Sequence, residues 1–118
     1  MESDKIFIQL KSILTAYESR LALVHNKPDN YYLNTQSTEK NKKPEFFAAV
    51  QIKKSYVAFH LMPIYSFPEL LNNVSEALKS KMQGKSCFNF KEENLALFEE
   101  LNALVKTSFE KYQALEKI

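Results

Sequence analysis

The sequence has few of the residues on which several common functions depend. It holds one glycine, Gly84, which excludes the glycine-rich phosphate loops of Rossmann and P-loop proteins, since these need several positions without a side chain. It holds one cysteine, Cys87, so no disulfide can form within the chain. Its longest apolar runs, such as residues 46–50, are far shorter than the roughly 20 residues of a membrane-spanning helix.

The net charge of the chain is also small. The chain has 16 Lys and Arg against 14 Asp and Glu, a formal charge of +2, which does not indicate wholesale binding to nucleic acid or membranes. The opening MESDKIF is too polar for a secretory signal, so we expect a cytoplasmic protein. A length of 118 residues predicts one compact domain over residues 1–118.

Three segments have the apolar period of helices. The first covers residues 4–21, with Ser3 or Asp4 as its cap, and the last covers residues 91–116. The middle helix is predicted over 67–82, because Ser66 and Glu69 match a capping box, Tyr65 and Leu70 a hydrophobic staple, and Gly84 suits the position after its end.

The strands are predicted from alternating and aromatic-rich segments. Residues 46–62 read as a β-hairpin turning at residues 53–55, with short strands at 31–33 and 86–90. Residues 22–30 read as a turn and residues 34–43 as a polar loop. The predicted fold is α+β in two layers: a mostly antiparallel sheet built around the hairpin, with the helices packed on one face.

The hairpin also carries a resemblance. Residues 46–63, FFAAVQIKKSYVAFHLMP, resemble the "YFAAFKKHIGLYPMP" signature of YdhG-like domains, and residues 84–90, GKSCFNF, are similar to that family's "GKGTIQF" segment. The resemblance implies a small bacterial cytosolic domain of the same α+β fold. Since some YdhG-like proteins are described as frataxin-like iron chaperones, it also implies iron binding as an alternative function.

Aromatic side chains near strand ends and at a helix entry suggest a ligand pocket between the sheet and the helices. Its predicted lining is Tyr32, His60, Tyr65 and Phe67, with the first three supplying polar groups. The commoner explanation for such residues is packing in the core and at its rim.

Carboxylates form the candidate metal site. Glu92, Glu93, Glu99 and Glu100 fall within nine residues with no basic residue among them, as in a surface for a hard cation or ferrous iron. They also fit a solvent-exposed helix face whose first residues complement the helix dipole.

Two further sets of residues have both a functional and a structural explanation. His60 and Cys87 lie on strands that could be neighbours, but no second pair of ligands makes them a zinc site, and a strand cysteine is usually a small buried apolar residue. The lysines at 40, 42, 43, 53 and 54 could form a basic edge that contacts an acidic protein or nucleic acid, or could only protect an edge strand. Without exposed aromatic residues between them, a single-strand platform is not supported.

No nucleophile with its base, no catalytic carboxylate pair and no cofactor motif can be assembled from these residues. The sequence therefore predicts a non-enzymatic binding or accessory domain, without a cofactor, whose partner is a small molecule or a protein rather than a membrane or nucleic acid. Iron handling, and a protein-interaction module or homodimer, stay open as alternatives.

Overall fold

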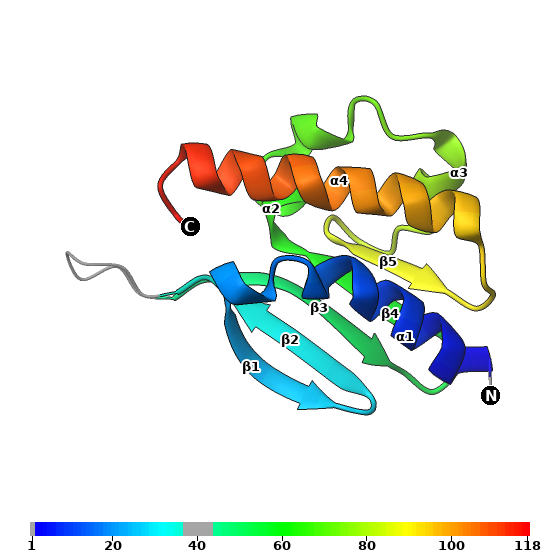
Figure 1. The fold of residues 1–118 in the computed structure, drawn as a ribbon. Helices are drawn as coiled ribbons and strands as arrows, with labels where there is room; N and C mark the ends of the chain where they lie inside the picture. Colours follow the sequence, from blue (N-terminus) through cyan, green and yellow to red (C-terminus); the bar gives the residue numbers. More distant parts are fainter. Residues whose placement is uncertain (1, 37–43) are drawn as a thin grey trace.

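The structure, a computed structural model, describes residues 2–36 and 44–118. In chain order its elements are α1 (Glu2–Thr15), η1 (Glu18–Arg20), β1 (Ala22–Lys27), β2 (Asn30–Asn34), β3 (Phe46–Ile52), β4 (Val57–Leu61), α2 (Met62–Ser66), η2 (Pro68–Leu71), α3 (Glu76–Lys79), β5 (Cys87–Phe90) and α4 (Leu95–Ala114). The strands form one antiparallel sheet in the order β1-β2-β3-β4-β5, and α1 and α4 lie on the same side of it (Figure 1). The predicted α+β fold is confirmed.

The central hairpin is confirmed, and the structure adds its register. Ala48 pairs with Leu61 and Ile52 with Val57, and the Lys53 N–H donates to the Tyr56 carbonyl at 2.8 Å to close a short turn. The side chains on the helix-covered face of β3 and β4 are apolar, and all but Ile52 are fully buried, whereas the other face includes the polar side chains of Gln51 and His60. This alternation is what a sheet covered on one face requires.

The N-terminal quarter differs from the sequence prediction. The first helix ends at Thr15, and residues 22–27, expected to form a turn, are strand β1. β1 has no clean alternation because it is an edge strand with a bulge between Leu23 and His25. The backbone hydrogen bonds to β2 make this segment a strand, although its own sequence does not predict one.

The helix predicted over 67–82 is wrong. These residues contain only the 3₁₀ turn η2 and the single turn α3 as helical elements, and they follow the short helix α2. Pro68 has no N–H to continue the hydrogen bonds of α2, and the Asn72–Asn73 pair favours a turn. No side-chain cap from Ser66 is present at η2; the working cap is Ser75, whose hydroxyl accepts from the Leu78 N–H at 3.1 Å. Apolar side chains of this segment still pack on the core, which is why the sequence shows a helical period there.

The last helix starts later than predicted. Asn94 caps it by accepting from the Leu97 N–H at 3.1 Å, so α4 begins at Leu95 and ends at Ala114. Glu92 and Glu93 therefore lie in the connection between β5 and α4, not on the helix.

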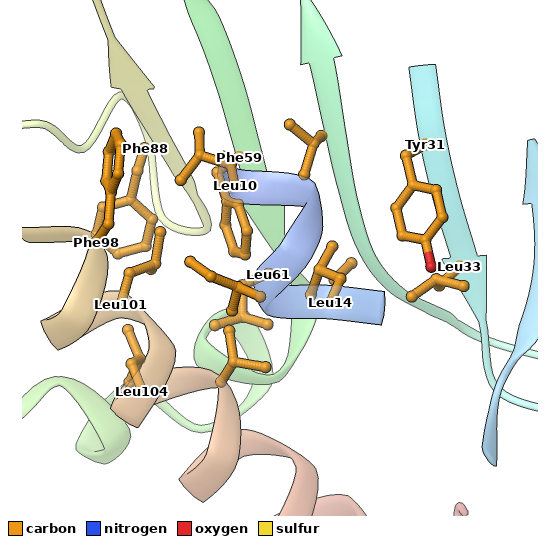
Figure 2. Close-up of a cluster of buried hydrophobic side chains, with 14 of the residues drawn as sticks. Leu10, Leu14, Tyr31, Leu33, Phe59, Leu61, Phe88, Phe98, Leu101 and Leu104 are labelled. Carbon is orange, nitrogen blue, oxygen red and sulfur yellow. The ribbon is translucent and has the colours of Figure 1, made fainter. Parts of the chain in front are cut away.

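The core fills the space between the sheet and these two helices (Figure 2). Leu10 and Leu14 of α1 and Leu101 of α4 meet Phe59 and Leu61 of β4, and all five are fully buried. Further aromatic rings complete this layer: Tyr31, Phe47, Phe88, Phe90, Phe98, Phe109 and Tyr112. Burial on this scale supplies most of the folding free energy of a small domain.

One polar group in the core lacks a partner. Ser108 is fully buried in α4, and its hydroxyl has no hydrogen bond within the described residues. We expect Ser108→Ala to raise the free energy of unfolding by about 1 kcal/mol, because it removes an unpaired buried polar group. Urea unfolding measures the change, and Thr107→Ala at the adjacent exposed position is the control. A destabilised Ser108→Ala protein would mean that the hydroxyl is paired in solution.

Candidate functional site

The side of the sheet away from α1 and α4 is the candidate site, and we call it the open face. The register places His25, Tyr32, Ala49, His60 and Cys87 in one row across all five strands of this face. All but Ala49 are only half-buried, and the described part of the chain places no helix over them. A row of aromatic, imidazole and thiol groups therefore lies on an accessible surface.

Aromatic rings gather at one end of the open face. The Tyr32 ring lies 4.7 Å from the Phe46 ring and 5.6 Å from the His25 ring, measured between centroids. Phe46 reaches this face because a bulge pairs Asn34 with Phe46 and Leu33 with Ala48, which turns the extra residue, Phe47, into the core. We call Tyr32, Phe46 and His25 the ring cluster.

His60 and Cys87 are direct neighbours in the middle of the face. The Leu61 N–H donates to the Ser86 carbonyl, so the adjacent pair, His60 and Cys87, is the closer, non-hydrogen-bonded kind of cross-strand pair. The Cys87 thiol donates to the Asn89 side-chain oxygen at 3.3 Å. Strand pairing thus brings together two groups that the sequence could only suggest as neighbours.

Their protonation states do not favour nucleophilic chemistry. Burial lowers the pKa of His60, and the nearby Lys53 ammonium lowers it further. Burial raises the pKa of the Cys87 thiol, which Lys53 only partly offsets. A neutral imidazole thus lies beside a protonated thiol, whereas a nucleophilic cysteine needs its thiolate.

His60 should make the stability of the folded protein depend on pH. Because burial disfavours the imidazolium, protonation favours the unfolded chain, where the pKa is about 6.5. Stability from neutral His60 is therefore present at about pH 7 and is lost as the pH falls below about 6.5, the pKa in the unfolded chain. Urea unfolding across this range should show a smaller loss for His60→Gln than for the wild type. Equal losses in both proteins would contradict a buried neutral imidazole.

A cavity of about 510 Å³ opens at the other end of the open face. Residues 80–83 run beside β5: the Asn89 N–H donates to the Lys81 carbonyl at 2.8 Å, and the Gln83 N–H to the Cys87 carbonyl at 2.9 Å. Met82, which pairs with Phe88, turns to the core, so Lys81 and Gln83 point to the open face. The lining residues are Ser55, Tyr56, Ser80, Lys81, Met82, Gln83, Asn89, Lys91 and Glu92.

The charge at this cavity is mainly positive. Lys81 and Lys91 line it, and Lys53 lies across the hairpin turn from Tyr56. A second cavity, of about 250 Å³, shares Ser55, Tyr56 and Lys91 with the first. It adds Lys53 and Lys54 from the hairpin turn and one carboxylate, Glu2, from the start of α1. The ion pairs among the described residues use Lys5, Lys79 and Lys117, so none of these cavity lysines is neutralised within 4.0 Å. We call Lys53, Lys81 and Lys91 the lysine cluster.

The four residues of the predicted pocket do not meet. Tyr32 and His60 lie on the open face, with Ala49 between them. Tyr65 is 55% exposed on α2. Phe67 packs against the core, its ring 6.5 Å from that of Tyr112. The prediction therefore combined residues from the two sides of the sheet.

The four glutamates also have separate surroundings. Glu93 accepts a hydrogen bond from Gln9, which lowers its pKa, and pairs with Lys5 at 3.3 Å. Glu100 accepts from the backbone N–H and hydroxyl of Ser75, at 2.5 and 2.7 Å. Glu99 is exposed, and Glu92 borders the large cavity. Across residues 2–36 and 44–118, no group of three or more His, Cys, Asp or Glu side chains could hold a metal ion.

Sequence reasoning found only part of the positive cluster. Lys53 and Lys54 were assigned to a basic edge, while Lys40, Lys42 and Lys43 lie outside the described residues. Lys81 and Lys91 were missed, because they are distant from the hairpin in sequence and only the pairing of residues 80–83 with β5 brings them there.

Comparisons with known proteins identify no relative. No family model matches the chain, and neither the curated proteins nor the solved structures include a match. Within the described residues, no helix is long and apolar enough to cross a membrane. A function can therefore be proposed only from the geometry of the open face.

Proposed function

We propose that this protein is a small non-enzymatic binding domain that holds an anionic, phosphate-bearing ligand in the cavity at the β5 end of the open face. The observation that carries the proposal is the lysine cluster: Lys81 and Lys91 line that cavity, Lys53 lines the smaller cavity beside it, and none of the three ammonium groups has a carboxylate partner within 4.0 Å in the described structure. Lysine binds phosphate as a point charge, and a concave surface strengthens the local field.

The other lining groups suit the same ligand. Ser55, Ser80 and Tyr56 offer hydroxyl groups, and Gln83 and Asn89 offer amides. These groups can donate hydrogen bonds to phosphate oxygens and can recognise the rest of a polar molecule. A volume of about 510 Å³ falls in the range of small-molecule sites.

The neutral state of His60 and Cys87 supports binding without catalysis, since neither of these two groups of the open face is an activated nucleophile. The proposal places the domain in the cytoplasm, because a single cysteine leaves no internal disulfide to stabilise it elsewhere. The relation to YdhG-like domains stays a prediction from the hairpin sequence. The iron-handling alternative gains no support from the separate surroundings of Glu93 and Glu100.

Thermal unfolding with inorganic pyrophosphate as the probe tests the proposal. We expect a saturable rise in Tm, since a ligand at about 100 times its Kd stabilises the native state by about 2.7 kcal/mol. Lys81→Ala and Lys91→Ala should each weaken the effect, whereas Lys106→Ala, an exposed lysine on α4, should leave it unchanged. A rise in Tm that is equal in all four proteins, or no rise, would overturn the proposal.

A further inference from the structure

The two ends of the open face are too far apart for one small molecule. Tyr32 lies on β2 and Lys91 on β5, three strand intervals away. The register also separates them by four positions along the strands, because Tyr32 aligns with His60 and Lys91 aligns with Tyr56. With strands about 4.8 Å apart and about 3.3 Å per residue, the ring cluster and the lysine cluster lie about 20 Å apart.

The space between the two clusters is lined by polar groups without net charge. Asn30 and Gln51 lie side by side there, joined by a hydrogen bond of 3.2 Å, and Asn89 lies two strands further on. None of the described strand residues that face this side is an aspartate or glutamate. The surface therefore suits an extended polyanion from end to end.

Resting on the proposed function, we propose that the phosphate-bearing ligand is a single-stranded nucleic acid that crosses the open face. Its bases stack on Tyr32 and Phe46, while phosphates further along the strand bind Lys53, Lys81 and Lys91. Half-exposed rings and a basic cavity on the same face of a sheet are the two elements that single-strand binding combines.

Exposed aromatic residues near the lysines could not be recognised from the sequence. Tyr32 and Phe46 occur in apolar segments that are typical of a core. The bulge at β3 and the uncovered face place both rings where a base can reach them. An acidic peptide could use the lysines, but its aspartate and glutamate side chains have no rings to stack on the ring cluster.

Fluorescence anisotropy with a short labelled oligouridylate tests the inference. We expect binding that weakens with salt, with a slope of log K against log salt of about −2, as three phosphate contacts on a single strand would give. The same sequence in a duplex should bind more weakly, because its bases are not available to stack.

Ring variants separate stacking from charge. Tyr32→Leu and Phe46→Leu should each weaken oligouridylate binding at least about fivefold. Tyr32→Phe should keep the affinity of the wild type, and Tyr65→Leu, at an exposed ring outside the face, is the matched control. Thermal unfolding of each variant verifies that it folds, and Tyr32→Phe keeps the test valid if a leucine variant does not.

The outcomes distinguish the two proposals. If pyrophosphate binds through Lys81 and Lys91 but the oligonucleotide does not bind, or binds equally to the Tyr32→Leu and Phe46→Leu proteins, this inference is overturned and the proposed function stands. Equal affinity for a poly-glutamate peptide of matched charge would also overturn it. If neither pyrophosphate nor the oligonucleotide binds, both proposals fail.

Discussion

Leu10→Asp should abolish the folded state. Leu10 is fully buried at the centre of α1, between the sheet and α4 (Figure 2). The change removes about 2 kcal/mol or more of apolar burial and places a carboxylate at a fully buried, apolar position. An unpaired buried charge costs several kcal/mol, and the whole stability of a small domain is about 5–15 kcal/mol. Circular dichroism during heating should show no cooperative transition.

Ile8→Asp is the matched control on the same helix. Ile8 is 65% exposed, so the same substitution two residues away should change the free energy of unfolding by no more than about 1 kcal/mol. A cooperative transition for Leu10→Asp close to that of Ile8→Asp would mean that α1 does not pack on the sheet by this face.

Phe59→Ala should lower the free energy of unfolding by about 3–5 kcal/mol. Phe59 is fully buried on β4, pairing with Val50 on one side and Phe88 on the other, and it lies under α1. Truncation leaves a cavity that the strands cannot close, since the hydrogen bonds of both ladders hold β4 in place. The urea midpoint should fall, with the m-value unchanged.

Tyr65→Ala provides the comparison for that change. Tyr65 is 55% exposed on α2, and removal of its ring should cost less than about 1 kcal/mol. If Phe59→Ala were as mild as Tyr65→Ala, the sheet would have to repack around the missing ring, contrary to the rigid core described above.

The hairpin and the two long helices could be predicted because local pattern and tertiary packing agree there. Residues 46–62 alternate between the two faces of the sheet, and the apolar positions of α4 repeat over several turns. At residues 67–82 the local pattern and the tertiary packing disagree. The apolar spacing is helical, but Pro68 and the two asparagines break the chain into short turns, and the side chains reach the core from these instead.

The candidate site could be predicted only in part, for a related reason. Tyr32 and His60 were identified as chemistry-bearing residues, yet they were grouped with Tyr65 and Phe67, which lie toward the helices. Which face a strand residue occupies depends on the register and bulges of the whole sheet, and these are long-range properties. Lys81 and Lys91 carry no local signal at all, since any exposed lysine has the same sequence appearance.

By itself, the sequence determined the α+β architecture, the central hairpin and the exclusion of glycine-rich phosphate loops, because each depends on local periodicity or on the presence of a residue type. Only the tertiary structure decided that β1 is a strand, that Phe46 and Tyr32 share an uncovered face, and that residues 80–83 bring lysines to β5. These features depend on hydrogen bonds and contacts between segments far apart in the chain, whose free energy appears only once the sheet has formed.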